Sequence, residues 1–225
     1  MINLCDGNLQ KRVLTGLLAW FRLDSMEIIV LTGGIGSGKS VVAGMLKELG
    51  AGIIDSDRVG HEVLEKGTPG WQEVIDTFGR EVLTAEEHID RKKLAQIVFQ
   101  DPESLRKLDK IIHPRIDQRV EARLQQYQKE GKKAVFIEMA ILAEAPWMER
   151  VDRVWAVKTP REVALNRLKE RGLSEPEALA RIANQPSPES RIKKGLVIIN
   201  NNGSLRDLRV KVEKLWDEIH NEDRK

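Results

Sequence analysis

A glycine-rich segment that contains one lysine and ends in a serine carries the clearest chemical signal in this chain. Residues Gly33–Ser40 read GGIGSGKS and satisfy the phosphate-loop pattern G-x-x-x-x-G-K-[ST]. Glycines in such a loop adopt positive φ angles and let backbone N–H groups approach phosphate oxygens, which a Cβ would obstruct. Lys39 is suited to neutralise the β- and γ-phosphates, and the Ser40 hydroxyl is a ligand for Mg²⁺. The segment therefore predicts a site for a nucleoside triphosphate.

The sequence on either side of this loop fits that prediction. The apolar run Ile28–Leu31 precedes it as a short buried strand, and apolar residues at helical spacing follow it. The positive N-terminus of that helix would point at the phosphates. A glycine-rich turn that binds nothing is the alternative, but the strand, the required glycine and lysine positions and the helix are all present. The residues expected to bind the nucleotide are Gly33, Gly34, Ile35, Gly36, Ser37, Gly38, Lys39, Ser40 and Val41.

Five short apolar runs separated by helical stretches predict an α/β fold with a five-stranded parallel sheet flanked by helices. The runs cover residues 27–32, 51–54, 134–137, 154–157 and 196–199. Ligands of such sheets bind at the carboxyl ends of the strands. The glycine-rich loop, Asp55, Asp57 and Glu138 all fall at such ends, so a common site is expected there.

Two further segments are expected to complete that site. About eighty residues separate the second and third strands, against the roughly ten to fifteen of a simple crossover. Residues 57–125 or so are helical in pattern and predict an acceptor-binding insertion, although a helical elaboration that only buries core would give the same periodicity. Residues 161–194 predict a basic helical lid. A charged run is usually a solvated face, but arginines that close over a transferring phosphoryl group stabilise its charge and exclude water.

The amino-acid composition limits the kinds of partner and the cellular compartment that are expected for this protein. Lys and Arg number 37 against 35 Asp and Glu, so the near-zero balance points to no nucleic-acid or membrane partner. The single cysteine, Cys5, excludes an internal disulfide and suits a reducing, cytoplasmic setting. One domain is expected, as a monomer or small homo-oligomer.

The first 25 residues stand apart from this domain. The apolar stretch Val13–Phe21 superficially resembles a signal sequence, but it is too short to span a bilayer, and no small-residue cleavage site precedes Met26. Because phosphate-loop strands commonly begin near a chain start, residues 1–25 are expected to be a dispensable extension of a domain at 26–225. A protein starting at Met26 that fails to fold or to bind ATP would contradict this.

Short motifs spread from Met26 to about Trp216 resemble dephospho-coenzyme A kinases. The loop itself and Ile54–Asp57 are similar to the family's phosphate loop and its Asp-Ala-Asp segment. More specific matches are Asp90–Leu94, Ile112–Pro114, Ile141–Glu144, Asn166–Leu168 with Arg171, Gln185 and Asn201–Gly203. The resemblance implies a P-loop kinase fold. It also implies transfer of the γ-phosphate of ATP, with Mg²⁺, to the ribose 3′-hydroxyl of dephospho-coenzyme A, giving coenzyme A and ADP.

The resemblance also implies roles for individual residues. A sugar hydroxyl needs a carboxylate to take its proton, and the family's proposed base corresponds to Asp57, which is expected to end the second strand. A helix N-cap or a ligand to Mg²⁺-bound water is the alternative for Asp57. Arg167 is assigned with Lys39 to the transferred phosphoryl group, and Arg171 is the weaker candidate. Glu138 is either near the Mg²⁺ shell or a solvated strand end.

Several positions depart from the family's commonest pattern. His61 stands where an arginine is frequent, and Val41, Met139–Ala140 and Leu196 also differ. A neutral imidazole lacks the permanent charge and the bidentate fork of arginine, which puts the acceptor geometry in question. His113, beside Pro114, is expected to be a hydrogen-bonding residue at a helix end.

Two rival functions stay open at this point. One is a small-molecule kinase with a different acceptor, such as a nucleoside or a nucleoside monophosphate. The other is a regulatory protein that binds ATP without transferring phosphate. The long insertion and Ile112–Pro114 favour dephospho-coenzyme A, and the chain has no Asn-Lys-x-Asp motif of the kind that specifies guanine.

Overall fold

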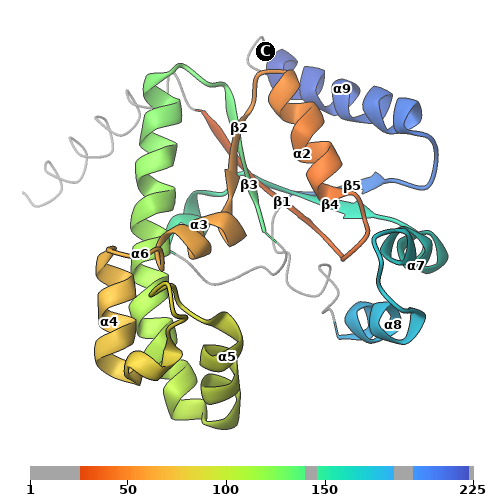
Figure 1. The fold of residues 1–225 in the computed structure, drawn as a ribbon. Helices are drawn as coiled ribbons and strands as arrows, with labels where there is room; N and C mark the ends of the chain where they lie inside the picture. The colour runs from red at the N-terminus through yellow and green to blue at the C-terminus, as the bar shows by residue number, and fades with distance from the viewer. Residues whose placement is uncertain (1–25, 140–145, 185–194, 223–225) are drawn as a thin grey trace, which may run out of the picture.

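A parallel β-sheet forms the centre of the computed structural model, which describes residues 26–139, 146–184 and 195–222. Its strand order is β2-β3-β1-β4-β5, and every neighbouring pair is parallel (Figure 1). The strands are β1 Glu27–Gly33, β2 Gly52–Asp55, β3 Ala134–Glu138, β4 Arg153–Lys158 and β5 Leu196–Asn200. The five predicted strands are confirmed, each shifted by no more than one residue at either end. The proposed N-terminal extension lies outside the described residues.

Helices connect the consecutive strands of this parallel sheet, except that the described residues between β3 and β4 form only a 3₁₀ turn. The helices are α2 Lys39–Glu48, α3 Ser56–Glu62, α4 Pro69–Phe78, α5 Arg91–Gln100, α6 Pro102–Lys129, α7 Arg161–Glu170, α8 Glu175–Ala183 and α9 Leu205–Glu222. Two 3₁₀ turns, η2 Arg80–Val82 and η3 Pro146–Arg150, complete the described elements. Among the described residues, no helix is long and apolar enough to cross a membrane.

Helices cover both faces of the sheet because alternate strand residues point to opposite sides. On one face, strand residues such as Leu31 and Trp155 pack against α2 and α9, where Leu46 and Trp216 are buried. On the other face, the strands pack against α3, α6 and η3. Trp216 and three further residues of the apolar stripe of α9 are buried, whereas Leu205, at the start of that helix, is 65% exposed.

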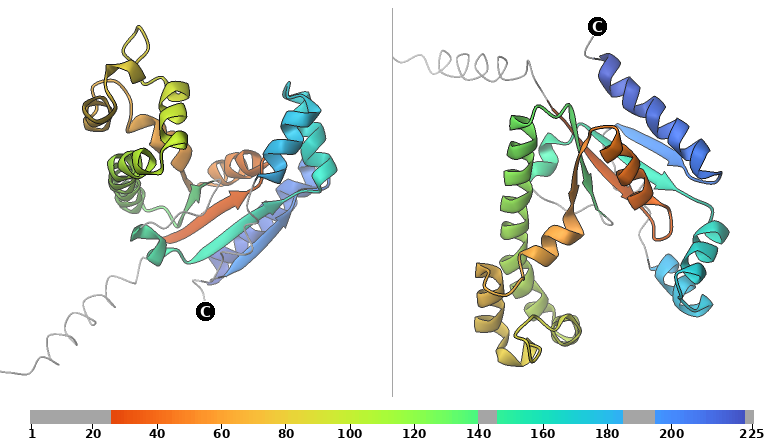
Figure 2. Two further views of the ribbon diagram at one scale, coloured as in Figure 1. Left: turned by 90° about the horizontal axis from the view of Figure 1, so that it is seen from below. Right: turned by 45° about the horizontal axis from the view of Figure 1, so that its top comes forward.

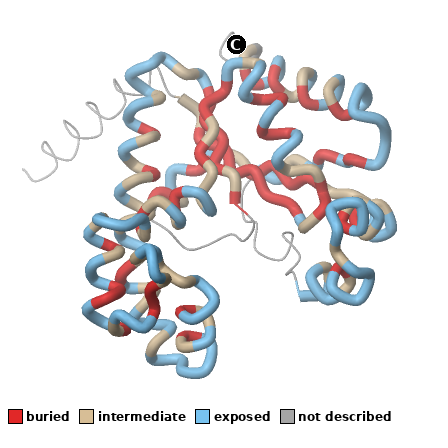
Figure 3. Tube along the Cα trace, viewed as in Figure 1, coloured by how far each residue is buried: buried red, intermediate tan, exposed pale blue. Residues whose placement is uncertain are grey.

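The segment between β2 and β3 builds a small core of its own. Helices α4 and α5, η2 and the first half of α6 share a buried cluster that includes Val74, Phe78 and Leu94 (Figure 3). Side chains cap these helices in sequence: Thr68 accepts from the Trp71 backbone at the start of α4, and Asp90 and Asp101 do the same for α5 and α6. These caps let short polar turns separate the helices.

Two helical arms stand beyond the carboxyl edge of the sheet. The α4–α5 arm rises on the β2 side and the α7–α8 pair rises on the opposite side, with β1 ending between them (Figure 2). The predicted insertion and lid therefore flank the edge where the glycine-rich loop begins. Residues 185–194 of the predicted lid lie outside the described residues.

Candidate active site

The loop between β1 and α2 forms an anion-binding nest. Gly36 and Gly38 have φ angles of 75° and 91°, the positive values that the sequence predicts. Gly38 is the N-cap of α2 and has no side chain to cap that helix, so the first N–H groups of α2 stay available to a ligand. A cavity of about 310 Å³ opens over the loop and is lined by Gly33, Gly34, Ile35, Gly36, Gly38, Lys39, Ser40, Val41 and Arg171.

Of the residues predicted to bind the nucleotide, Ser37 alone is absent from the lining of this cavity. It is 3% exposed, and its hydroxyl has no hydrogen-bond partner among the described residues. Its place in the site comes from its peptide group, because Ser37 N donates to the Gly34 carbonyl across 3.0 Å and closes the turn of the loop.

A carboxylate from β3 meets the lysine and the serine of the loop. The Ser40 hydroxyl donates to Glu138 Oε1 across 2.9 Å, and Lys39 Nζ lies 3.7 Å from the same oxygen. The Lys39 and Glu138 side chains are only 13% and 12% exposed. The sheet causes this meeting, since Glu138 pairs with Leu31 of β1 and with Asp55 of β2 at the carboxyl edge. Of the two interpretations of Glu138, a solvated strand end is therefore wrong.

The two aspartates after β2 have different environments. The sequence placed Asp57 at the strand end, but β2 ends at Asp55 and Asp57 lies in the first turn of α3. Asp55 takes the N-cap role, because its carboxylate accepts from the Arg58 backbone N–H across 3.0 Å, so the alternative in which Asp57 caps this helix is wrong. The Asp57 carboxylate is exposed and makes no hydrogen bond or ion pair with any described residue.

Arg167 of α7 reaches the loop from the other side. Its Nη1 donates to the carbonyls of Gly36 (3.2 Å) and Ser37 (3.4 Å), and its Nη2 donates to Asn201 Oδ1 (3.4 Å). Arg171, one turn further along, lines the cavity itself. The structure thus brings both predicted arginines to the loop, with Arg167 on its carbonyl side and Arg171 at its open side.

The two histidines singled out from the sequence lie outside these contacts. His113 was expected at a helix end, but it lies inside α6 with 59% of its side chain exposed, near Asp109 on the preceding turn. The helix continues through Pro114, and the Arg115 guanidinium donates to the Ile111 carbonyl close to the interrupted ladder. His61 is exposed on α3, one turn after Asp57.

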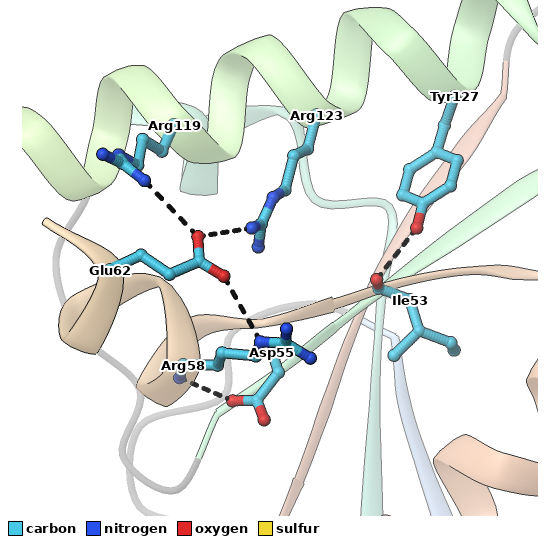
Figure 4. Close-up of polar contacts among 7 residues, drawn as sticks. All are labelled: Ile53, Asp55, Arg58, Glu62, Arg119, Arg123 and Tyr127. Carbon is cyan, nitrogen blue, oxygen red and sulfur yellow. Dashed lines mark hydrogen bonds and ion pairs between the residues drawn. The ribbon is translucent and has the colours of Figure 1, made fainter. Parts of the chain in front are cut away.

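An ion-pair cluster fixes α3, the helix of Asp57, against α6. Glu62 is 15% exposed and receives three arginines: Arg58 at 3.3 Å, Arg119 at 3.5 Å and Arg123 at 2.5 Å (Figure 4). The hydrogen bond from Arg123, followed by the charges of all three arginines, lowers the pKa of Glu62 against the opposing effect of burial. Tyr127 adds a hydrogen bond from its hydroxyl to the Ile53 carbonyl across 3.0 Å.

We expect Glu62→Gln to destabilise the fold by about 1–2 kcal/mol at neutral pH, because it removes the charge of a carboxylate that is only 15% exposed and leaves Arg123, the most buried of the three arginines, without its anion. The folded-state pKa of Glu62 lies below its unfolded value of 4.5, so this stability is complete above pH 4.5 and is lost as pH falls through the folded pKa. Urea unfolding at pH 7 and at pH 3.5 measures the difference. Glu103→Gln is the control, because Glu103 is 67% exposed in its ion pair with Lys107. It should change the free energy of unfolding by less than about 0.5 kcal/mol.

Equal destabilisation by Glu62→Gln and Glu103→Gln at neutral pH would contradict this assignment. So would a Glu62→Gln effect that stays the same in acid.

Two of these residues were missed at sequence level as participants in the site. Asn201 appeared only as part of a motif, although its amide contacts both the loop and Arg167. Glu62 gave no signal beyond its spacing of four from Arg58, because its other partners lie on α6 far along the chain.

The parallel sheet, the glycine-rich loop with its lysine and serine, and the two helical arms define a P-loop kinase. A family model described as "Dephospho-CoA kinase" matches residues 27–207. The chain belongs to the dephospho-CoA kinase family.

Individual relatives agree with this assignment. The chain is 44% identical over 195 residues to a dephospho-CoA kinase of Dehalococcoides mccartyi, covering 86% of this chain and 98% of the relative. It is 42% identical over 188 residues to that of Carboxydothermus hydrogenoformans, covering 83% and 91%. Among solved structures, the dephospho-CoA kinase of Campylobacter jejuni is similar with a TM-score of 0.65 and 30% identity, over 87% of this chain and 98% of that one. A Thermus thermophilus crystal structure is similar with a TM-score of 0.70 and 32% identity, over 86% and 97%.

Proposed function

We propose that this protein transfers the γ-phosphate of ATP to the ribose 3′-hydroxyl of dephospho-coenzyme A, producing coenzyme A and ADP with Mg²⁺ as cofactor. The observation that carries the proposal is the meeting of Lys39, Ser40 and Glu138 at the mouth of the glycine-rich loop, in a chain of the dephospho-CoA kinase family. The three side chains suit a magnesium-bound nucleotide, and the family supplies the acceptor.

Hydroxyl and carboxylate oxygens are among the ligands that Mg²⁺ takes in proteins. Ser40 Oγ and Glu138 Oε1 are in hydrogen-bond contact, so both could serve one ion at this point of the site. Ser40 would be a direct ligand, and Glu138 would bind the ion or one of its waters. The ion would supply charge stabilisation on the β- and γ-phosphates.

The remaining residues have separable roles in this proposal. The backbone N–H groups of Gly33–Val41 hold the phosphates, and Lys39 exchanges its contact with Glu138 for the β- and γ-phosphate oxygens. Asp57 accepts the proton of the acceptor hydroxyl, since its carboxylate has no hydrogen-bond or ion-pair partner in the part of the chain that the structure describes. Arg167 stabilises the charge of the transferred group, and the α4–α5 arm holds the acceptor.

Glu138→Gln should raise the Mg²⁺ concentration needed for half-maximal activity by about tenfold or more, because an amide is a weaker ligand than a carboxylate for this ion or its waters. Titration of initial rates with MgCl₂ at saturating ATP measures this. Ser56→Ala is the matched control, since the Ser56 hydroxyl contacts the backbone carbonyl of Glu138 and not its carboxylate. A lower rate with an unchanged Mg²⁺ requirement would remove Glu138 from the metal site.

The function itself is tested by Mg²⁺-dependent ADP release without acceptor and then with dephospho-coenzyme A, adenosine, AMP or CMP, identifying each product by mass. Strong stimulation by dephospho-coenzyme A, with coenzyme A appearing, is expected. Stimulation by a nucleoside or nucleotide alone would keep the kinase class and change the acceptor. No stimulation by any acceptor would overturn the proposal in favour of a regulatory nucleotide binder.

A further inference from the structure

Asn201, directly after β5, is held in place by the end of the neighbouring strand. It is 3% exposed. Its backbone N–H donates to the Lys158 carbonyl across 2.7 Å, and its own carbonyl accepts from the Thr159 hydroxyl across 2.7 Å. Both backbone groups of Asn201 are therefore paired, and its side chain reaches the glycine-rich loop.

The Asn201 side-chain amide connects the loop to the lid arginine. Its Nδ2 donates to the Ser37 carbonyl across 2.7 Å, and its Oδ1 accepts from Arg167 Nη2 across 3.4 Å. Arg167 Nη1 lies 3.4 Å from the same Ser37 carbonyl, which closes a three-membered network. An amide suits this place because it offers a donor and an acceptor on one planar group.

The network sets the orientation of one peptide in the phosphate-binding loop. In a planar trans peptide the carbonyl and the N–H point in opposite directions, so a fixed Ser37 carbonyl also fixes the Gly38 N–H. Asn201 and Arg167 hold that carbonyl on the far side of the loop, and Gly38 lines the cavity. The Ser37 hydroxyl does not provide this anchor, since it has no partner in the described part of the chain.

The contact also explains why this position of the loop has no side chain. A Cβ on Gly38 would lie 2.3 Å from Asn201 Nδ2, and the φ angle of 91° is already unfavourable for other residues. Gly38 and Asn201 are therefore fitted to each other, although 163 positions of sequence separate them.

We propose that Asn201 is a positioning residue of the phosphoryl-transfer site, which fixes the Ser37–Gly38 peptide in its phosphate-binding orientation and docks Arg167 against it. The inference rests on the proposed nucleotide-dependent function. Without Asn201 the loop spends only a fraction of its time in the competent orientation, and the apparent affinity for nucleotide falls by that fraction.

The test measures ADP affinity by calorimetry with MgCl₂ present, thermal stability, and steady-state kinetics in the full chain. Asn201→Ala should weaken ADP binding about tenfold and lower kcat, with the KM for dephospho-coenzyme A unchanged. Asn201→Asp keeps an acceptor for Arg167 but loses the donor to Ser37, so a similar loss of ADP affinity is expected. Asn200→Ala, an exposed neighbour on the same strand, is the matched control and should bind ADP as the wild type does.

A double-mutant cycle separates positioning from general structural damage. Because Asn201 and Arg167 hold the same Ser37 carbonyl, the double variant Asn201→Ala/Arg167→Ala should lose less ADP affinity than the sum of the two single losses. Additive losses, or an Asn201→Ala variant that stays folded and binds ADP normally, would overturn the inference. If Asn201→Ala does not fold, Asn201→Ser is measured in its place. A wild type that binds ADP but does not phosphorylate dephospho-coenzyme A would instead refute the proposed function. The role of Asn201 could then still be tested, because ADP affinity is measured without the acceptor.

Discussion

Asp57→Asn is expected to lower kcat about 10²–10⁴-fold while the affinity for ATP stays unchanged. An amide cannot accept the proton of the acceptor hydroxyl, so the loss falls on the chemical step. ATP binding is spared because the Asp57 carboxylate makes no hydrogen bond or ion pair with the loop or with any other described residue. Steady-state kinetics with dephospho-coenzyme A and calorimetry with a non-hydrolysable ATP analogue separate the two quantities.

Asp55→Asn is the matched control, since it changes the same group two residues earlier. Asp55 caps α3 through the Arg58 N–H, and asparagine is nearly as good an N-cap as aspartate. Stability and kcat should therefore change little. Retained turnover in Asp57→Asn, or an equal loss in both variants, would remove Asp57 from the mechanism and point to a structural role for this turn.

Arg167→Ala is expected to lower kcat about 10³-fold or more and to weaken ADP binding about tenfold. The first effect follows from the loss of a positive charge near the transferred phosphoryl group. The second follows from the structure, because the guanidinium also donates to the carbonyls of Gly36 and Ser37. Initial rates at saturating substrates and calorimetry with ADP measure the two effects separately.

Arg167→Lys tests whether charge alone is enough. A lysine keeps the charge but cannot donate to Gly36, Ser37 and Asn201 at once, so most of the loss should remain. Arg209→Ala, which removes an exposed arginine paired with Glu48 on α2, should leave both quantities unchanged. Weaker acceptor binding alone in Arg167→Ala would instead assign Arg167 to ground-state positioning of the acceptor.

Much of the fold was predictable because it depends on local pattern. The apolar runs at Ile28–Leu31 and Ala134–Ile137 are buried on both faces, which is typical of central strands in a parallel sheet. The loop was predictable down to its positive φ angles, because only glycine adopts them without strain. The end of β2 was not, because Asp55 and Asp57 are both good N-caps and only the folded geometry selects one.

The candidate site was predictable only in part. Lys39 and Ser40 follow from a contiguous motif, whose geometry depends on near neighbours in sequence. The sequence assigned Arg167 to the transferred phosphoryl group but did not indicate that it also contacts the loop carbonyls and Asn201. Arg167, the loop residues Gly36 and Ser37, and Asn201 lie in three separate segments of the chain, and no local sequence pattern predicts that they meet.

The sequence by itself therefore determined the class of chemistry, the family and the strands, since each follows from residue types that lie close together along the chain. Only the tertiary structure decided that Glu138 meets Ser40, that Glu62 receives three arginines, and that Asn201 contacts the Ser37 carbonyl. The physical reason is the packing of segments that are distant in sequence. Strand order and register bring Glu138 and Asn201 to one edge of the sheet, and the packing of α3 on α6 brings the arginines of α6 to Glu62. Hydrogen bonds between such residues depend on distances of a few tenths of an ångström.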